Sequence, residues 1–313
     1  GRPMTTSQDF VNWVCGPELD PRFLAYLLQA TRAYIRSLSS GAIHQTVYMP
    51  TVESFFVCTP PMEQQRRISR TLDEQSSICE RMRAAAIARI EATTALAAAS
   101  LRERFSAAGM NRWSLRPLGD VGQIVSGINL GRPTNGAATE RVPYLRVANV
   151  KDGYLDLSHV NEIEATEAEI RRLRLQVGDL LLTEGGDPDK LGRGCVWEGE
   201  LSECIHQNHV FRVRFPLDEI EPAFVSAQIG SAYGKAYFIA HAKQTTGIAT
   251  INRSVLARFP LMLPSLTEQR RIARALGESA KDAARLEGEL ESEFAAVNAL
   301  LAAFLRRAFS GEL

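Results

Sequence analysis

Residues 60–106 and 264–310 repeat each other at a constant offset of 204 positions and without a gap. The first copy contains QQRRISRTLDE and the second contains EQRRIARALGE, and the far ends LRERFS and LRRAFS still align. An ungapped match over 47 residues predicts one structural unit that occurs twice in the chain. This repeat constrains the fold more than any other feature of the sequence.

Both copies of the repeat have the apolar spacing of a long amphipathic helix. In the second copy, apolar residues recur at steps of mostly three and four: Ile272, Leu276, Ala280, Ala283, Leu290, Phe294, Val297, Leu301, Phe304 and Ala308. The first copy follows the same pattern with Ile68, Leu72, Cys79, Met82, Ala86, Ile90, Ala97, Leu101 and Phe105. Helices of this length need a partner for their apolar stripes, so we expect an antiparallel coiled-coil pair. Two unrelated surface helices are the alternative.

The ends of these helices have local sequence signals. Pro264 and the capping-box spacing from Ser265 to Glu268 mark the start of the second helix. Gly109 is expected to close the first helix and Gly311 the second.

Residues between the two helices have a different character. Short strand-like runs (WSLRPL, VPYLRVANV, GDLLLT, GCVWEG and VFRVRF) alternate with turn residues, and residues 164–175 and 222–242 are predicted to be helices. The predicted fold class is α+β, with globular domains alternating with two long helices in a pseudo-two-fold repeat.

A shorter version of this domain precedes the first helix. SQDFV (7–11) resembles HQNHV (206–210), DPRF (20–23) resembles EPAF (221–224), and GAIHQT (41–46) resembles GIAT (247–250). We therefore expect four segments: part of a first globular domain (1–60), a helix (61–109), a whole second domain (110–263) and a helix (264–313). The first domain has no counterpart of residues 113–203, and Met4 is not the first residue. We expect either a fragment of a longer chain or a second polypeptide that completes this domain.

Composition points to a cytoplasmic protein without a membrane span. Hydrophobic residues make up 45% and charged residues 23% of the chain, the formal net charge is zero, and no signal peptide is evident. Five cysteines without a CxxC spacing favour reduced thiols. Zinc binding by Cys195, Cys204, His206 and His209 is a minor alternative, because structural zinc sites usually have closely paired ligands.

No catalytic motif is present in the sequence. We find no phosphate-binding GxxxxGK[ST], no HExxH, no GxSxG and no GxGxxG. Pro188-Asp189 followed by Glu198 and Glu200 resembles part of a metal-dependent nuclease site, but no lysine lies close to the second acid. Acidic turn residues explain this stretch better, and we predict no catalytic or metal site.

Positive charge is sorted onto the same part of each repeat. Residues 222–267 contain Lys235, Lys243, Arg253 and Arg258 but no Asp or Glu, and residues 21–52 contain three arginines and no acid. Such sorting is typical of a surface that faces nucleic-acid phosphates. A solvated helix whose neighbours lack acids is the alternative. Within this stretch, Gln244, Thr245, Thr246 and Asn252 can donate to and accept from base edges or phosphates, although such clusters also form ordinary turns.

Several longer stretches together resemble the specificity subunit of type I restriction–modification systems. They are TSQDFVNWV (6–14), PYLRVANVKDGYLDL (143–157), GDLLLTEGGDPDKLGRG (178–194), TTGIATINRSVLARFPLMLPSLTEQRRIA (245–273) and the repeated [EQ]QRRI helix start. The resemblance implies two target-recognition domains, each reading half of a split site in double-stranded DNA, with two antiparallel helices that set the spacing. It also implies a subunit without catalytic activity or a cofactor of its own. Its partners would be two adenine methyltransferase subunits, which bind S-adenosylmethionine, and a motor–nuclease subunit.

The resemblance also implies which segments contact DNA. Carried over by position, they are the segments around 146–151, 184–193 and 243–252 in the second domain and the segment around 41–48 in the first. The contact residues expected in them are Arg146, Asn149, Lys151, Lys190, Arg193, Lys243, Gln244, Thr245, Thr246 and Asn252, with His44 and Gln45 in the first domain. Arg146 and Asn149 could instead only organise their loop. A structural adaptor that never touches DNA, and a nuclease, are the other functions we consider.

Overall fold

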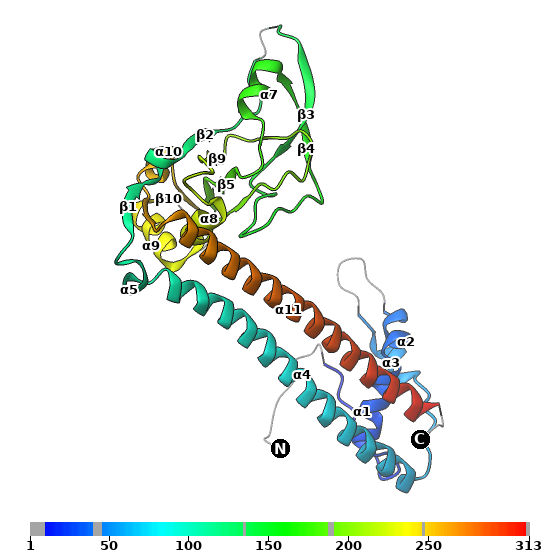
Figure 1. The fold of residues 1–313 in the computed structure, drawn as a ribbon. Helices are drawn as coiled ribbons and strands as arrows, with labels where there is room; N and C mark the ends of the chain where they lie inside the picture. The colour runs from blue at the N-terminus through cyan, green and yellow to red at the C-terminus, as the bar shows by residue number, and fades with distance from the viewer. Residues whose placement is uncertain (1–9, 40–45, 134–135, 187–190, 246–247, 311–313) are drawn as a thin grey trace. The chain divides into compact units, whose positions relative to one another are not determined.

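Two helices of 43 and 44 residues dominate the computed structural model: α4 (Met62–Arg104) and α11 (Leu266–Phe309) (Figure 1). The structure describes residues 10–39, 46–133, 136–186, 191–245 and 248–310. By contact it divides into two compact units, which are residues 1–93 with 285–313 (unit 1) and residues 94–284 (unit 2). Each long helix therefore contributes one end to each unit.

The helix ends follow the sequence signals in part. The amide of Glu268 donates to the Ser265 hydroxyl at 3.4 Å, which is one of the two hydrogen bonds of the predicted capping box, whereas the Glu268 carboxylate accepts from Arg271. The prediction that Gly109 closes the first helix is wrong, because α4 ends at Arg104 and Ser106 then caps a separate short helix, α5 (Ala107–Met110). Gly311 lies outside the described residues.

In unit 1, a short helix packs its apolar face against both long helices. The unit contains α1 (Pro21–Ala30), α2 (Arg32–Ser37) and α3 (Met49–Glu53). Phe23 of α1 packs in one apolar cluster with Leu72 near the start of α4 and Ala308 near the end of α11. Its ring centroid lies 5.4 Å from that of Phe309. The start of one long helix therefore lies beside the end of the other.

Unit 2 repeats this arrangement with the roles of the helices exchanged. The ring centroid of Phe224 in α8 (Pro222–Gly230) lies 5.7 Å from that of Phe105, directly after α4. Ile272 near the start of α11 belongs to the same apolar cluster. Phe105 and Phe309 are equivalent positions of the repeat, as are Phe23 and Phe224. The antiparallel helix pairing and the pseudo-two-fold repeat predicted from the sequence are thereby confirmed.

A buried glutamine near the start of each long helix fixes the neighbouring short helix. Gln65 and Gln269 are 1% and 2% exposed. Their side-chain oxygens accept from the amides of Asp20 (2.8 Å) and Glu221 (3.0 Å), which precede α1 and α8. Their amide groups donate to the carbonyl five residues earlier, at 2.7 and 3.0 Å. The repeated QRRI motif thus encodes the same docking contact twice.

The sheets of unit 2 hold its apolar core. A four-stranded sheet has the order β2–β9–β5–β7, with β2 (Gln123–Ser126), β9 (Val210–Arg214), β5 (Leu180–Thr183) and β7 (Gly194–Val196). A second sheet contains β4 (Asn161–Thr166), β3 (Thr139–Leu145) and β8 (Ile205–His206). A pair joins β1 (Ser114–Pro117) to β12 (Pro260–Leu263). A small sheet has the strand order β10–β11–β6, with β10 (Lys243–Thr245), β11 (Ile248–Thr250) and β6 (Gly185–Gly186).

Two predicted helices of this region are only partly correct. Residues 222–242 form two helices, α8 and α9 (Ala232–His241), because Ser231 is extended and its hydroxyl caps the second helix. The helix predicted for 164–175 is the shorter α7 (Glu167–Leu173), which Thr166 and Glu169 start with a capping box. The remaining helices are α6 (Leu118–Val121) and α10 (Arg253–Ala257).

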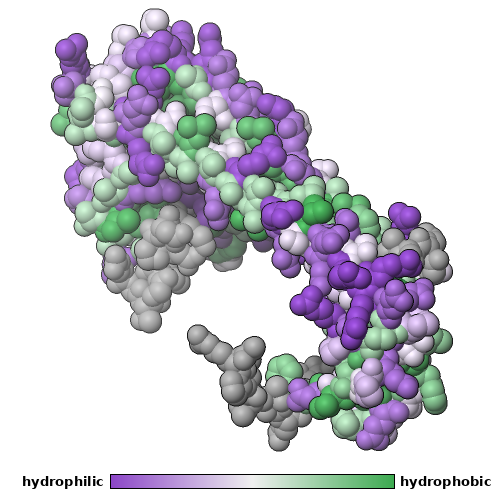
Figure 2. Space-filling view, turned by 90° about the horizontal axis from the view of Figure 1, so that it is seen from below, coloured by the Kyte–Doolittle hydropathy of each residue, from purple (hydrophilic) through white to green (hydrophobic). Residues whose placement is uncertain are grey.

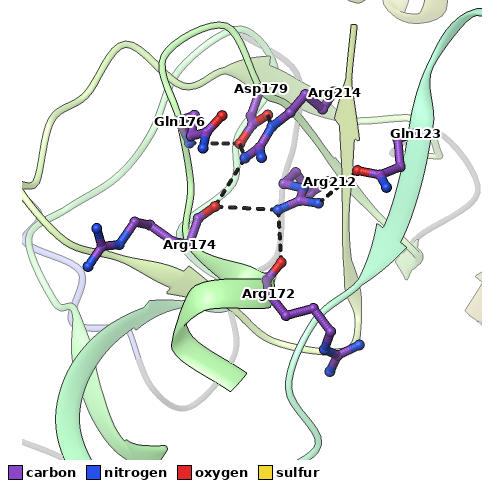
Figure 3. A network of polar contacts seen from close by, with 7 residues as sticks. All are labelled: Gln123, Arg172, Arg174, Gln176, Asp179, Arg212 and Arg214. Carbon is purple, nitrogen blue, oxygen red and sulfur yellow. Dashed lines mark hydrogen bonds and ion pairs between the residues drawn. The ribbon is translucent and has the colours of Figure 1, made fainter. Parts of the chain in front are cut away.

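A cluster of arginines fixes one end of the main sheet (Figure 3). Asp179, before β5, is 1% exposed and accepts two hydrogen bonds from Arg214 at 2.7 and 2.6 Å. The buried Arg212 donates to the carbonyl of Arg172 (3.2 Å) in the last turn of α7 and to that of Arg174 (3.4 Å) directly after the helix. Burial lowers the pKa of Arg212 from its ordinary value. These contacts join α7 to β5 and β9, at the sheet end where Asp179 and Arg214 lie.

Unit 1 leaves exposed several positions whose counterparts unit 2 buries. Val14 is 98% and Val57 40% exposed, whereas the equivalent Val213 of β9 and Leu261 of β12 are fully buried. In unit 2 these strands pair with β1, β2 and β5. Among the described residues of unit 1, residues 10–16 and 56–59 form no strand. Val14 and Val57 therefore occupy positions that neighbouring strands cover in unit 2.

Apolar residues also occur on the surface of the chain. On the face seen in Figure 2, hydrophobic residues are interspersed with hydrophilic ones. Among the described residues, α4 alone is long and apolar enough to cross a membrane by length and composition, with a mean hydropathy of 1.3 over 18 residues. A single such helix is weak evidence for a membrane span, because helices of soluble proteins pass the same test.

Candidate nucleic-acid interface

Three segments that are far apart in the sequence meet at one hollow in unit 2. Its volume is about 510 Å³. The segment 146–151 contributes Ala148 and Lys151, the segment 184–193 contributes Glu184 and Arg193, and the segment 243–252 contributes Thr250. The other residues at its wall are Val147, Thr183, Gly185, Gly186 and His209. The three segments that the sequence resemblance assigned to DNA contact in this domain are therefore neighbours in space.

The small sheet brings two of these segments together. Ala249 and Thr250 of β11 lie opposite Gly186 and Gly185 of β6. A Cβ atom on Gly185 would lie 2.7 Å from the Thr250 methyl group and 2.8 Å from the Ala249 carbonyl oxygen. Glycine at position 185 thus allows the close approach of the strands that builds the wall of the hollow.

Two cationic side chains lie at the hollow. The ammonium of Lys151 lies 3.9 Å from Asp156, in a loose ion pair whose lysine side chain is 30% exposed. Arg193 pairs with no carboxylate in the part of the chain that the structure describes. Its carbonyl accepts from the Thr183 amide at 3.0 Å, which anchors its backbone to the end of β5. A phosphate is a suitable counter-ion for such a guanidinium.

The hollow also contains one acidic side chain, Glu184. Its carboxylate lies 2.5 Å from Nδ1 of His209, and Nε2 of His209 lies 3.4 Å from the side-chain amide of Asn208. The Glu184 backbone is held on both sides, because its amide donates to the His209 carbonyl (2.9 Å) and its carbonyl accepts from Ile251 (2.8 Å). This fixed carboxylate makes the hollow mixed in charge rather than uniformly basic.

Lys243 lies on the strand next to Thr250, which lines the hollow. In the register of β10 and β11 it is opposite Thr250, and directly opposed residues project from the same face of a sheet. Lys243 is exposed, as are Arg253 and Arg258, and none of the three has an acidic partner among the described residues. Lys235 differs, because its ammonium lies 3.5 Å from Asp152. Three of the four cations of residues 222–267 thus remain available to an anionic partner.

Asn149 is reassigned from DNA contact to loop organisation. It is only 3% exposed. Its side-chain oxygen accepts from the Arg146 amide (2.9 Å), and its nitrogen donates to the carbonyls of Asp156 (2.9 Å) and His159 (3.0 Å). The guanidinium of Arg146 also donates to the His159 carbonyl, at 3.3 Å. Both residues therefore shape the loop that presents Lys151, as the alternative interpretation proposed.

The remaining predicted contact residues have different outcomes. The Asn252 side chain accepts from the Val255 amide at 2.9 Å and so caps α10, which makes it a capping residue. The backbones of Gln244 and Thr245 form part of β10. Four predicted residues lie outside the described residues: His44, Gln45, Lys190 and Thr246.

The alternative metal sites receive no support from the arrangement of side chains. Cys195 and Cys204 lie in an apolar cluster, and burial raises the pKa of each thiol to about 12. His206 is fully buried with Nδ1 2.7 Å from the Val210 carbonyl. In the described ranges, no three His, Cys, Asp or Glu residues form a group that could hold a metal ion. Glu200 accepts from the Glu198 amide at 3.0 Å, as expected of turn acids.

Sequence reasoning did not single out Thr183, Glu184, His209 or Thr250 as site residues. Thr183 is the last residue of the buried strand β5 and Thr250 the last residue of β11, so neither differs from an ordinary residue at a strand end. His209 lies in the HQNHV stretch that aligns the repeats, and the sequence suggested it only as a minor candidate for zinc binding. Their proximity depends on strand pairing between distant segments, which no local pattern reveals.

Comparison with known proteins gives a consistent relationship over part of the chain. No protein-family model matches. The chain is 28% identical over 176 residues to the type I restriction enzyme EcoKI specificity subunit of Escherichia coli (strain K12), which covers 55% of this chain and 37% of that protein. It is 24% identical over 173 residues to the putative type I restriction enzyme MjaX specificity subunit of Methanocaldococcus jannaschii, covering 53% and 39%. The match thus spans little more than a third of each of these relatives.

Solved structures share the fold. A structure described under complex assembly and conformational transition of the type I R-M system superposes with a TM-score of 0.73 at 21% identity, covering 95% of this chain and 72% of that one. The HsdS subunit from Thermoanaerobacter tengcongensis gives a TM-score of 0.57 at 21% identity, covering 95% and 71%. The chain is therefore similar in sequence, over about half of its length, to specificity subunits of type I restriction enzymes, and it shares its fold with solved structures of type I systems.

Proposed function

We propose that the chain is a non-catalytic, sequence-specific DNA-recognition subunit of a type I restriction–modification complex in the cytoplasm. The observation that carries this proposal is the convergence of the segments 146–151, 184–193 and 243–252 on one hollow. Lys151 and Arg193 at its wall and Lys243, opposite the wall residue Thr250, supply the positive charge that DNA phosphates need. The relatives' names describe specificity subunits, which agrees with this role.

Protein docking is the second part of the proposal. We assign to the long helices the binding of two adenine methyltransferase subunits, which would supply S-adenosylmethionine, and to the assembled complex a motor–nuclease subunit. In unit 1, Ile78 and Met82 of α4 are each 39% exposed and are four residues apart, so they lie on one helix face. Cys79 and Ala86 are buried on another face. Exposed apolar residues beside a buried stripe favour a protein partner.

Selection from a random duplex pool tests the proposal. The full chain is incubated with its adenine methyltransferase partner at two salt concentrations, and the retained DNA is sequenced. We expect a short enriched motif and weaker retention at higher salt. A split motif with a fixed spacer would indicate two reading domains, whereas a single motif would indicate reading by unit 2 alone. The absence of enrichment at both salts would favour the adaptor function. Magnesium-dependent cleavage by the purified chain alone would favour the nuclease.

A further inference from the structure

The carboxylate of Glu184 occupies a defined position at the wall of the hollow. Glu184 lies between β5 and β6, and its backbone is hydrogen-bonded to His209 on one side and Ile251 on the other. Its side chain is 30% exposed. The side chain therefore starts from a rigid backbone and reaches the open space of the hollow.

One oxygen of this carboxylate remains without a partner in the described part of the chain. Oε2 lies 2.5 Å from Nδ1 of His209, whereas Oε1 accepts no hydrogen bond. Glu184 is also the single acid among the residues that line the hollow, next to the cationic Lys151 and Arg193. A carboxylate at this place repels a phosphate, so phosphate binding alone does not account for it.

Base edges in the major groove offer a donor that fits a carboxylate. Cytosine presents an N4 amino group, while guanine and thymine present acceptor oxygens, which a carboxylate would repel. Adenine presents an N6 amino group beside the N7 acceptor, so a carboxylate fits it less well than a side-chain amide does. Resting on the proposed DNA-reading function, we propose that Glu184 reads a cytosine in the half-site bound by unit 2.

Substitution of Glu184 by glutamine tests this assignment with little change in shape. The full chain and the Glu184→Gln variant are each used to select from the same random duplex pool at one salt concentration. We expect the wild-type motif to contain one position that strongly favours cytosine. In the variant the preference for cytosine over adenine at that position should fall about 10-fold or more, because an amide can bond both N6 and N7 of adenine. The other positions should stay the same.

Two further variants make the result decisive. Glu162→Gln removes an exposed acid on β4 that does not line the hollow, and it should leave the whole motif unchanged. His209→Ala removes the partner of Glu184 but keeps the carboxylate, so the preference for cytosine at that position of the motif should persist. If His209→Ala reproduces the effect of Glu184→Gln, Glu184 only positions His209 and the assignment is overturned.

The possible failures can be told apart. A wild-type motif that Glu184→Gln leaves unchanged would overturn the cytosine assignment while DNA reading stands. A uniform change in affinity without a change at one position would do the same. A wild-type chain that selects no motif would overturn the proposed DNA-reading function together with this inference.

Discussion

Arg89 of α4 donates a hydrogen bond to Glu293 of α11 at 3.0 Å, and these two residues occupy the same position in the two copies of the repeat. Two equivalent positions of an antiparallel pair can touch only near the midpoint of the pairing, so Arg89 and Glu293 mark that midpoint. Two copies of one helical segment thus pack against each other as the two halves of a symmetric dimer would.

The Arg89–Glu293 ion pair should contribute little to the free energy of unfolding and act mainly by fixing how α4 aligns with α11. Both side chains are exposed, at 60% and 44%, so Arg89→Ala should lower the free energy of unfolding by less than about 1 kcal/mol. Arg89→Glu should cost more, and adding Glu293→Arg should restore most of the loss. Urea denaturation of the four proteins measures this. A loss well above 1 kcal/mol for Arg89→Ala would show that the pair contributes more than an exposed ion pair.

The buried glutamines should be important for stability in both units. Gln269→Ala leaves the Glu221 amide without its acceptor and should cost about 2 kcal/mol, since an unsatisfied buried donor costs about 1–3 kcal/mol. Gln65→Ala should have a similar effect in unit 1. Gln64→Ala changes an exposed neighbour and should be nearly neutral. Equal losses for Gln64→Ala and Gln65→Ala in chemical denaturation would contradict the docking role.

Asn149→Ala should destabilise unit 2 without altering sequence preference. The substitution removes the partners of one amide and two carbonyl groups in the loop, so we expect a loss of about 2–3 kcal/mol. Thermal unfolding measures this loss, and Asn129→Ala at an exposed position is the control. DNA selection with Asn149→Ala should return the wild-type motif. A changed base preference at one position would restore Asn149 as a contact residue.

Cationic residues at the hollow should set the salt dependence of DNA binding. Arg193→Ala and Lys243→Ala should each weaken binding to all sequences and reduce the slope of log affinity against log salt by about 0.9. Lys281→Ala removes an exposed charge on α11 outside the hollow and should leave the slope unchanged. Fluorescence anisotropy over a salt series measures these slopes. Equal slopes for all four proteins would remove these residues from the interface.

Acid should weaken unit 2 through His206. Burial lowers the pKa of His206 from 6.5 to about 4. Between these values the unfolded state binds a proton that the folded state does not, so stability is complete above pH 6.5 and falls as the pH drops toward 4. NMR titration of the histidine Cε1 protons measures the pKa directly, and denaturation at pH 7 and pH 5 measures the consequence. An ordinary pKa for His206 would contradict its burial.

Part of this structure could be predicted from the sequence because it is encoded locally. The apolar periodicity after Pro60 and Pro264 predicted both long helices, and the match between the copies predicted their antiparallel pairing. The hollow could not be predicted in the same way. It depends on pairing of Gly185 with Thr250 and on the loop contact of Asn149 with His159, and both are made between segments that no local pattern connects.

The contact between Phe23 and Phe309 has a consequence for how the chain is made. Phe23 is synthesised 286 residues before its aromatic partner Phe309. At roughly 5–20 residues per second, α1 waits about 15–60 s for the helix end that covers it. During synthesis the apolar face of α1 is therefore open to chaperones and to other nascent chains. Unit 2, whose segments are all synthesised before residue 285, can fold first and unit 1 last.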